Sequence, residues 1–302
     1  MNLQMPIKHL LLAAFIFIHV QALLAQNNLL VLQSDFGLKD GAVSAMKGVA
    51  MGVSTNLKIF DLTHDIPAYN VWEASYRLHQ AAPYWPTGTV FVSVVDPGVG
   101  SSRKSVVLKT KSGSFFVSPD NGSLTMVAED LGISEIRKID ETKNRRPGSE
   151  DSYTFHGRDV YAYTAARLAS GTITFEEVGP QLPPKVVSIT YQKPAFENGA
   201  VNGTIPILDI QYGNIWTNID EKTFKKLNLK QGDIVHVTIY RDKKKVYEGD
   251  MPYAATFSSV KKSYPVCYLN SLLNVSFALN EGNFSEMYKV FSGPAWTVVL
   301  SR

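Results

Sequence analysis

Short apolar runs that each end beside an aspartate recur through the first half of the chain and constrain its fold most strongly. The runs lie at 29–34, 57–62, 89–95 and 114–118, and their acids are Asp35, Asp61, Asp96 and Asp120. Stretches with helical spacing alternate with them, at 41–51, 70–82, 123–131 and 157–171. Strands that alternate with helices predict an α/β domain with a doubly wound, mostly parallel sheet.

The pattern changes near Pro183, where the segment 181–185 (QLPPK) is typical of a linker. Short strands and turns follow it to the end of the chain, which predicts a smaller all-β, barrel-like domain. We therefore expect an α/β domain over 27–182 and a β domain over 190–302. The 302 residues and the hydrophobic content of 45% are enough for both domains to bury a core.

The first residues have the pattern of a targeting segment. Lys8 and His9 precede an apolar run that ends at Ala25, which predicts a cleaved signal peptide over 1–25. The run is short for a membrane span, and polar residues interrupt it. An exported, periplasmic or secreted protein is the expectation. An uncleaved anchor and a misassigned start are the alternatives, and without a signal peptide the protein would be cytoplasmic.

Charge and cysteine content exclude several classes of protein. The net charge of +3 is too small to indicate a nucleic-acid partner. The basic runs at 143–146 and 241–245 are expected to be solvated loops or turns. Cys267 is the single cysteine, so an internal disulfide and a cysteine-based metal site are excluded.

The four acids define a candidate site, because ligands of parallel sheets bind beyond the carboxyl ends of the strands. The loop after Asp96 reads DPGVGSSR, from 96 to 103. It lacks the Gly-Lys-Ser/Thr end of a phosphate-binding loop, and a strand rather than a helix is expected after it. A phosphate-binding loop is therefore not expected, and the glycines either hold a catalytic acid or only turn the chain.

His156 directly precedes the predicted helix over 157–171. The positive end of a helix dipole favours a neutral imidazole, which can accept a proton or orient a water molecule. A histidine that only packs against or caps its own helix is the alternative. His64 and Asp65 could imitate metal ligands, but no paired spacing supports this, so we predict no metal.

Eight motifs stand in order along the chain and together carry a resemblance to a known family. They are QSDFGLKDG (33–41), MKGV (46–49), DLTHDIP (61–67), VVDPGVGSSR (94–103), SPDNGSL (118–124), TFHGRD (154–159), DIQYGNIWTN (209–218) and NSLLNVSFALN (270–280). The chain resembles the S-adenosyl-L-methionine (SAM) hydrolases that form adenosine, also called SAM hydroxide adenosyltransferases. This family is related to the SAM-dependent fluorinase and chlorinase.

The resemblance implies hydrolysis of SAM to adenosine and L-methionine, without a cofactor or a metal. It places Asp96, Arg103 and His156 where the family holds water or hydroxide for attack at C5′. The related halogenases carry tyrosine where Asp96 and His156 stand, and the fluorinase carries serine where Gly157 stands. The chain is therefore similar to the hydrolase branch. A halide adenosyltransferase and an exported adenosine- or SAM-binding protein are the alternatives.

The resemblance also implies substrate-binding roles. Asp35 falls where the family binds the ribose hydroxyls, and a carboxylate suits a cis-diol. The residues expected to wall the nucleoside are Tyr69 and Phe155, and those expected to bind the methionine ammonium, the adenine and the methionine carboxylate are Asp209, Asn214 and Ser271. In the family these last three come from a neighbouring subunit of a homotrimer, and the site lies at the subunit interface. Asn121 is expected only to shape a turn.

Overall fold

The computed structural model describes residues 27–302, so the predicted signal peptide over 1–25 lies outside the described residues. The chain divides into two compact units between Ser188 and Ile189. From residue 27 onward, no helix is both long enough and apolar enough to cross a membrane.

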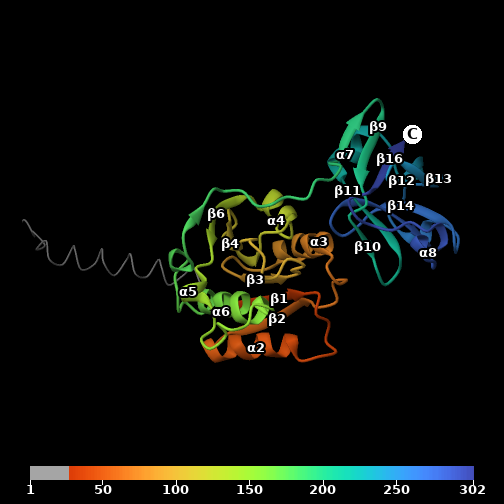
Figure 1. Ribbon diagram of the computed structural model, residues 1–302. Coiled ribbons are helices and arrows are strands. Elements are labelled where there is room, and N and C mark those ends of the chain that lie inside the picture. The colour runs from red at the N-terminus through yellow and green to blue at the C-terminus, as the bar shows by residue number, and fades with distance from the viewer. Residues whose placement is uncertain (1–26) are drawn as a thin grey trace, which may run out of the picture. The chain divides into compact units, whose positions relative to one another are not determined.

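The first unit is built, within residues 27–188, on a seven-stranded sheet in the order β2-β1-β3-β5-β4-β6-β7 (Figure 1). Its strands are β1 (Leu29–Ser34), β2 (Lys58–Thr63), β3 (Val90–Val94), β4 (Ser105–Thr110), β5 (Phe115–Pro119), β6 (Ile133–Lys138) and β7 (Gln181–Leu182). β2, β1, β3 and β5 pair in parallel, whereas β4 pairs antiparallel with both β5 and β6. Because β1 and β3 are parallel neighbours, their carboxyl ends meet at one edge of the sheet.

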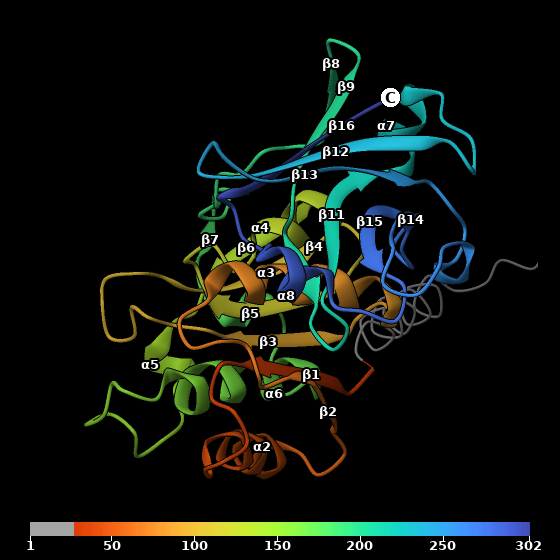
Figure 2. The same ribbon diagram turned by 90° about the vertical axis from the view of Figure 1, so that its right-hand side faces the viewer.

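Helices cover both faces of this sheet, as Figures 1 and 2 show. One face carries α2 (Ala42–Val53), η2 (Gly157–Ala162) and α6 (Tyr163–Ala169), and the other carries α3 (Val71–Ala81) and α4 (Thr125–Asp130). Successive residues of β1 enter different cores: Leu30 and Leu32 belong to one apolar cluster and Val31 to the other. This alternation follows from the two-residue period of a strand. The predicted doubly wound α/β architecture is confirmed.

The helix expected over 157–171 is two elements. η2 is a π-helical stretch that starts directly after His156, and α6 continues it. A π-helical turn adds a residue to the usual turn, and such turns are frequent at functional sites. Three short helices, η1 (Ala82–Tyr84), α5 (Glu141–Asn144) and η3 (Glu176–Val178), complete the first unit's helical segments among the described residues.

The second unit consists of two antiparallel sheets. One has the order β10-β11-β15-β14 and the other β13-β12-β16-β9-β8. The strands are β8 (Ala195–Glu197), β9 (Ala200–Thr204), β10 (Ile207–Asp209), β11 (Asn214–Asp220), β12 (Ile234–Arg241), β13 (Lys244–Pro252), β14 (Pro265–Leu269), β15 (Asn274–Leu279) and β16 (Trp296–Ser301). The helical segments are α7 (Glu221–Phe224), η4 (Lys225–Leu227), η5 (Phe257–Ser259) and α8 (Phe284–Tyr288). One apolar cluster draws Ile215 and Phe277 from the first sheet and Val237 and Leu300 from the second, so the predicted all-β unit is confirmed.

Candidate active site

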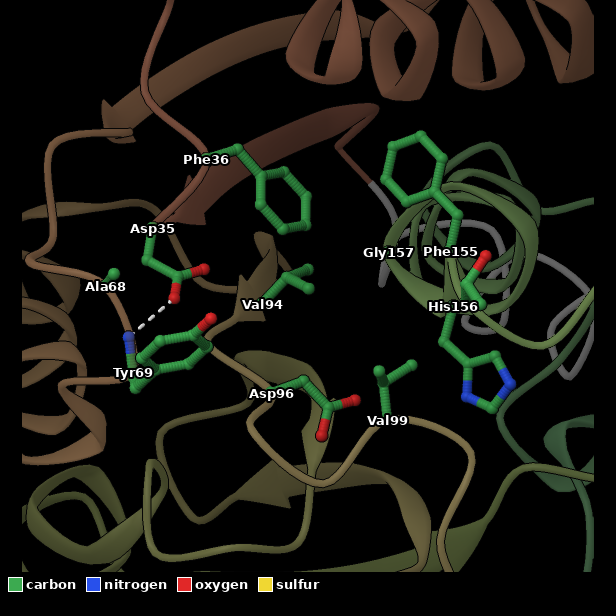
Figure 3. A pocket seen from close by; sticks show the side chains of 11 residues that line it. Asp35, Phe36, Ala68, Tyr69, Val94, Asp96, Val99, Phe155, His156 and Gly157 are labelled. Carbon is green, nitrogen blue, oxygen red and sulfur yellow. Dashed lines mark hydrogen bonds between the residues drawn. The ribbon is translucent and has the colours of Figure 1, made fainter.

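A hollow of about 240 Å³ opens where β1 and β3 end (Figure 3). Its lining combines two carboxylates and an imidazole with apolar and aromatic side chains: Asp35, Phe36, Ala68, Tyr69, Val94, Asp96, Val99, Thr154, Phe155, His156 and Gly157. The position agrees with the rule that open parallel sheets bind ligands beyond the carboxyl ends of their strands.

Two of the four predicted strand-end acids, Asp35 and Asp96, lie in this hollow. The other two do not, which corrects the expectation of one four-acid site. Asp61 lies within β2 and pairs with Lys47, and hydrogen bonds from Lys47 and His64 outweigh the effect of burial and lower its pKa. Asp120 follows β5 and accepts a hydrogen bond from the backbone of Val187 at 2.8 Å.

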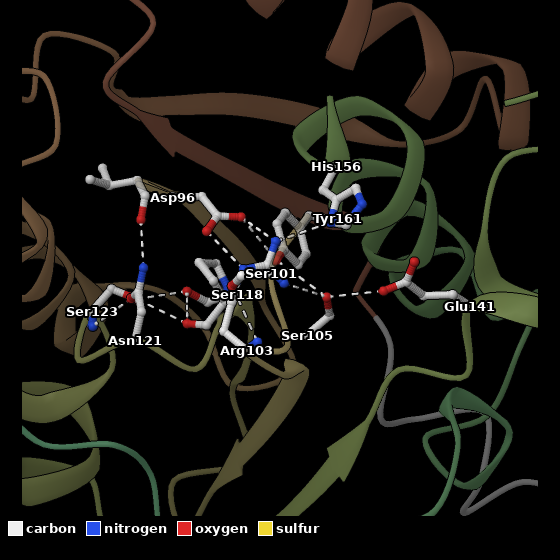
Figure 4. Close-up of polar contacts among 12 residues, drawn as sticks. Asp96, Ser101, Arg103, Ser105, Ser118, Asn121, Ser123, Glu141, His156 and Tyr161 are labelled. Atoms are coloured by element: carbon white, nitrogen blue, oxygen red, sulfur yellow. Dashed lines mark hydrogen bonds and ion pairs between the residues drawn. The ribbon is translucent and has the colours of Figure 1, made fainter. Parts of the chain in front are cut away.

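Asp96 and Arg103 form a two-pronged ion pair across the glycine loop (Figure 4). Arg103 Nε donates to Asp96 Oδ1 at 2.8 Å, and Arg103 Nη2 donates to Asp96 Oδ2. Two successive turns bring the ends of the loop together, and Gly100 takes a φ of +78°, which glycine adopts without strain. Burial opposes the charge of Arg103, but the hydrogen bond with Asp96 prevails and raises the pKa of the guanidinium.

His156 completes this cluster from a distant part of the sequence. Its Nδ1 lies 3.0 Å from Arg103 Nη2, and the residue is 5% exposed. Burial lowers the pKa of the imidazole, and the charges of Arg103 and Arg145 lower it further. The imidazole is therefore neutral at pH 7 and has one nitrogen that can accept a proton or a hydrogen bond.

Aromatic rings form the apolar side of the hollow. Phe36 and Phe155 meet edge to face, with ring centroids 5.6 Å apart. A Cβ atom on Gly157 would lie 3.1 Å from Val94 Cγ1 and 3.2 Å from the Phe36 ring, so a larger residue there would require these side chains to move. Gly157 thus allows η2 to approach β3 and the Phe36 ring closely.

The backbone of Tyr69 is held beside Asp35. Its N–H donates to Asp35 Oδ2 at 2.9 Å, its φ is +68°, and its side chain is largely exposed. A tyrosine in this conformation carries backbone strain, and such strain concentrates at functional sites. An exposed ring at the mouth of the hollow can cover a ligand.

A chain of hydrogen bonds that runs from the buried Ser34 to the exposed Asp61 supports the segment that carries Asp35. Ser34 Oγ lies 2.7 Å from His64 Nδ1, and His64 Nε2 lies 3.0 Å from Asp61 Oδ1. This serine–histidine–aspartate order imitates a hydrolytic triad, but Ser34 is fully buried and does not line the hollow. The chain is therefore a structural support, and His64 is used in it as a hydrogen-bonding group.

Four polar residues of the cluster are not identified from the sequence: Ser105, Glu141, Arg145 and Tyr161. The hydroxyl of the buried Tyr161 lies 3.3 Å from Ser105 Oγ and donates to Asp96 Oδ2 at 3.4 Å. Arg145 belongs to the basic run expected to be solvated, and that prediction is wrong for it, because it pairs with Glu141 and contacts His156. The spacing of Glu141 and Arg145, four residues apart, is the signal that could have identified the pair.

A second hollow, of about 550 Å³, lies in the second unit. Asp209 and Asn214 both line it, and Asn214 Nδ2 donates to Asp209 Oδ2 at 3.2 Å. Between them Gly213 has a φ of +68°, and its backbone lies so close to Asn283 that a Cβ atom would overlap it. The structure brings these two predicted binding residues together.

Ser271 is placed elsewhere in the second unit. It is exposed in the turn between β14 and β15. The strand register sets this turn beside Asp220, at the end of β11 opposite to Asn214. The role of Ser271 stays a prediction. In the first unit, Asn121 donates to the backbone of Val95 at 2.8 Å and accepts from that of Ser123, which are the contacts of a turn-shaping residue.

An α/β unit with an acid–arginine–histidine cluster at its strand ends, followed by an antiparallel β unit, defines the class of protein. Residues 30–179 match the model of the SAM hydroxide adenosyltransferase N-terminal domain, and residues 203–297 match that of the C-terminal domain. The chain belongs to the SAM hydroxide adenosyltransferase family.

Both SAM hydrolases and a fluorinase are among the relatives that are similar to this chain. An (R)-S-adenosyl-L-methionine hydrolase of Methanocaldococcus jannaschii is 41% identical over 66% of this chain and 70% of its own length. The enzyme of the same name from Salinispora tropica is 37% identical over 86% and 93%, and a fluorinase of an Actinoplanes species is 28% identical over 90% and 97%. The crystal structure of an uncharacterized conserved protein from Thermotoga maritima matches with a TM-score of 0.82 and 36% identity, over 90% of this chain and all of the other.

Proposed function

We propose that this protein hydrolyses SAM to adenosine and L-methionine, by attack of water or hydroxide at C5′. The observation that carries the proposal is the cluster of Asp96, Arg103 and neutral His156 beside an aromatic hollow. Relatives named as SAM hydrolases support the same reaction.

The chemistry of SAM explains why such a site suffices. The sulfonium leaves as a neutral thioether, so the reaction needs an aligned nucleophile but no general acid, cofactor or metal. Asp96 and neutral His156 would orient the water, Asp96 would take up its proton, and Arg103 would stabilise hydroxide character. Attack of hydroxide on a sulfonium neutralises charge, which a dry aromatic pocket favours.

Substrate binding would use both units. In the first, Asp35 would accept hydrogen bonds from the two ribose hydroxyls, and Tyr69 and Phe155 would wall the nucleoside. In the second, Asp209, Asn214 and Ser271 would bind the ammonium, the adenine and the carboxylate. We propose that these three act on the site of a neighbouring subunit in a homotrimer, as the family resemblance implies.

The halide adenosyltransferase alternative fits the site less well. The cluster presents a carboxylate and an imidazole where a halide would have to approach, and a carboxylate repels an anion. The tight packing around Gly157 also leaves little room for a serine there. An exported protein that only binds adenosine or SAM would not need the two-pronged ion pair between Asp96 and Arg103.

The test is product analysis of SAM incubated with the protein in oxygen-18 water. Mass spectrometry should find the label in adenosine and none in methionine, with a rate unchanged by a chelator. Absence of adenosine above the uncatalysed background would contradict the proposal. In chloride buffer, formation of 5′-chloro-5′-deoxyadenosine would instead indicate the halide alternative, and tight binding without turnover the binding-protein alternative.

A further inference from the structure

Both ring nitrogens of His156 face guanidinium groups. Nδ1 lies 3.0 Å from Arg103 Nη2, and Nε2 lies 3.1 Å from Arg145 Nη2. An arginine only donates, and a neutral imidazole has only one accepting nitrogen, so one of the two contacts is a hydrogen bond at any moment. A protonated ring would direct both of its N–H groups at positive charges, which makes that form unfavourable.

Arg145 is fixed on every side. Its Nη2 donates to Glu141 Oε2 at 2.7 Å, its Nη1 donates to the backbone carbonyl of Ser152 at 3.3 Å, and its guanidinium lies 4.6 Å from the centre of the Tyr153 ring. Its side chain is only 7% exposed. These contacts hold a long side chain in one conformation and offset the rotamer entropy that it loses. The folded structure therefore fixes the guanidinium beside the imidazole.

The contacts around His156 close into a ring that passes through Arg145 and Glu141. Figure 4 shows the other half of this ring, from His156 through Arg103 and Ser105 to Glu141. Glu141 Oε1 accepts from Ser105 Oγ at 3.3 Å, and Ser105 Oγ accepts from Arg103 Nη1 at 3.1 Å. Glu141 therefore connects the two arginines, directly to Arg145 and through Ser105 to Arg103. It neutralises part of the charge that Arg145 brings, so the two residues act on His156 with opposite signs.

We propose that Arg145 and Glu141 are positioning residues that set the protonation of His156, Arg145 keeping the imidazole neutral and Glu141 limiting that effect. This inference rests on the proposed function, in which neutral His156 acts on the attacking water. The charged and titratable groups facing the imidazole come from three places, the Asp96–Arg103 loop, the segment from α5 to the start of η2, and η2 itself: Asp96, Arg103, Glu141, Arg145, Tyr153 and Tyr161.

The test compares two single variants that should act in opposite directions. Arg145→Gln removes a positive charge, so the acid limb of kcat/KM for SAM should move to higher pH by about one pH unit. Glu141→Gln removes a negative charge, so the limb should move to lower pH by a similar amount. Arg145→Lys keeps the charge and should restore the limb to near its wild-type position.

A matched control comes from α5, the short helix that carries Glu141 and ends just before Arg145. Lys143→Gln removes an equal charge, but the Lys143 side chain is 75% exposed, so solvent should screen it and the acid limb should stay in place. A merely structural role for Arg145 would lower the melting temperature and the amount of active protein without moving the limb.

Imidazole nitrogen NMR of the full chain gives a readout that needs no turnover. The His156 signals are assigned by their loss in His156→Gln, and their titration midpoint should move up in Arg145→Gln and down in Glu141→Gln. Unchanged midpoints, or shifts of the same sign in both variants, would overturn the inference. If the wild-type protein forms no adenosine but the midpoints move as expected, the proposed function fails while the role of Arg145 stands.

Discussion

A single guanidinium holds both oxygens of Asp96, and this fork fixes the direction in which the carboxylate faces the hollow. Each carboxylate oxygen can accept more than one hydrogen bond, so the ion pair with Arg103 leaves lone pairs for a water molecule. Tyr161 approaches one of those oxygens from the buried side. At the scale of the residue, Asp96 is therefore a firmly oriented hydrogen-bond acceptor with one side open to the hollow.

Replacement of Asp96 by asparagine should abolish most of the activity. The amide cannot take up a proton from water and directs an N–H group at Arg103, so we expect kcat/KM to fall by at least about 100-fold. Product assays by chromatography give the rate, and calorimetry should show that SAM still binds. Asp120→Asn is the control, because Asp120 also follows a strand but lies outside the hollow. Equal activity in wild type and Asp96→Asn would refute the assigned site.

Asp35→Ala should weaken binding of the nucleoside. If this carboxylate accepts from the two ribose hydroxyls, as proposed, its loss should raise KM by roughly 10- to 100-fold. The matching measurement uses a SAM analogue without the 2′-hydroxyl, which should bind wild type more weakly but lose less in the variant. If the two losses simply added, Asp35 would not contact that hydroxyl.

The family resemblance predicts the acid, arginine and histidine of the site because each stands in a short motif that can be matched by sequence. The sequence does not predict Arg145, because a basic run has the same composition whether its side chains are solvated or folded against a buried histidine. Tyr161 is missed for a related reason. At helical spacing a buried tyrosine looks like any other core residue, and only the tertiary structure brings its hydroxyl to Asp96.

At the scale of the element, hydrogen bonds between neighbouring strands hold the site in place. Ser34 ends β1, Asp61 lies in β2 and His64 follows it, so the chain from Ser34 through His64 to Asp61 joins the two strands where Asp35 leaves the sheet. Alternation of apolar runs and helices predicts these strands. The π-helical turn of η2 is not predicted, since its apolar pattern over six residues differs little from that of an α-helix.

His64→Ala should therefore reduce stability and binding together. The substitution leaves the buried Ser34 hydroxyl without its histidine partner and opens a cavity, so unfolding should cost about 2 kcal/mol less. Thermal unfolding followed by circular dichroism measures this effect, and KM for SAM should rise because Asp35 loses its support. His236→Ala is the control, since the side chain of that histidine is 39% exposed and lies on β12, in the second unit. Comparable melting temperatures for wild type and His64→Ala would show that the chain is dispensable.

At the scale of the whole molecule, the two units offer complementary chemistry. The first presents carboxylates and an imidazole around an aromatic hollow, and the second presents an aspartate bonded to an asparagine in another hollow. Strand and helix periodicities encode the cores of both units, but residues that join separate chains follow no such period. Sequence periodicity therefore does not predict a site that a neighbouring chain completes.

Mixed oligomers provide that experiment. Asp96→Asn inactivates the first unit of a chain and Asp209→Asn the second, so each variant alone should form little adenosine. If three chains form a ring and each site combines the first unit of one chain with the second unit of its neighbour, a mixed trimer regains about a third of its sites. Co-expression with two affinity tags and sequential purification isolates such trimers, and light scattering should give three times the chain mass of 33.4 kDa.

The activity of the mixed oligomer distinguishes sites formed between chains from sites formed within one chain. Only between chains can an intact first unit meet an intact second unit. Sites completed within one chain would leave every site of a mixed oligomer with one inactive unit, and the activity would stay at the level of the single variants. A control with Asp96→Asn carried by both tagged chains should also stay inactive, which excludes an effect of co-expression itself. If adenosine formation recovers only in the mixed sample, Asp209 serves the hollow of another chain. The enzyme is then active only as an assembly.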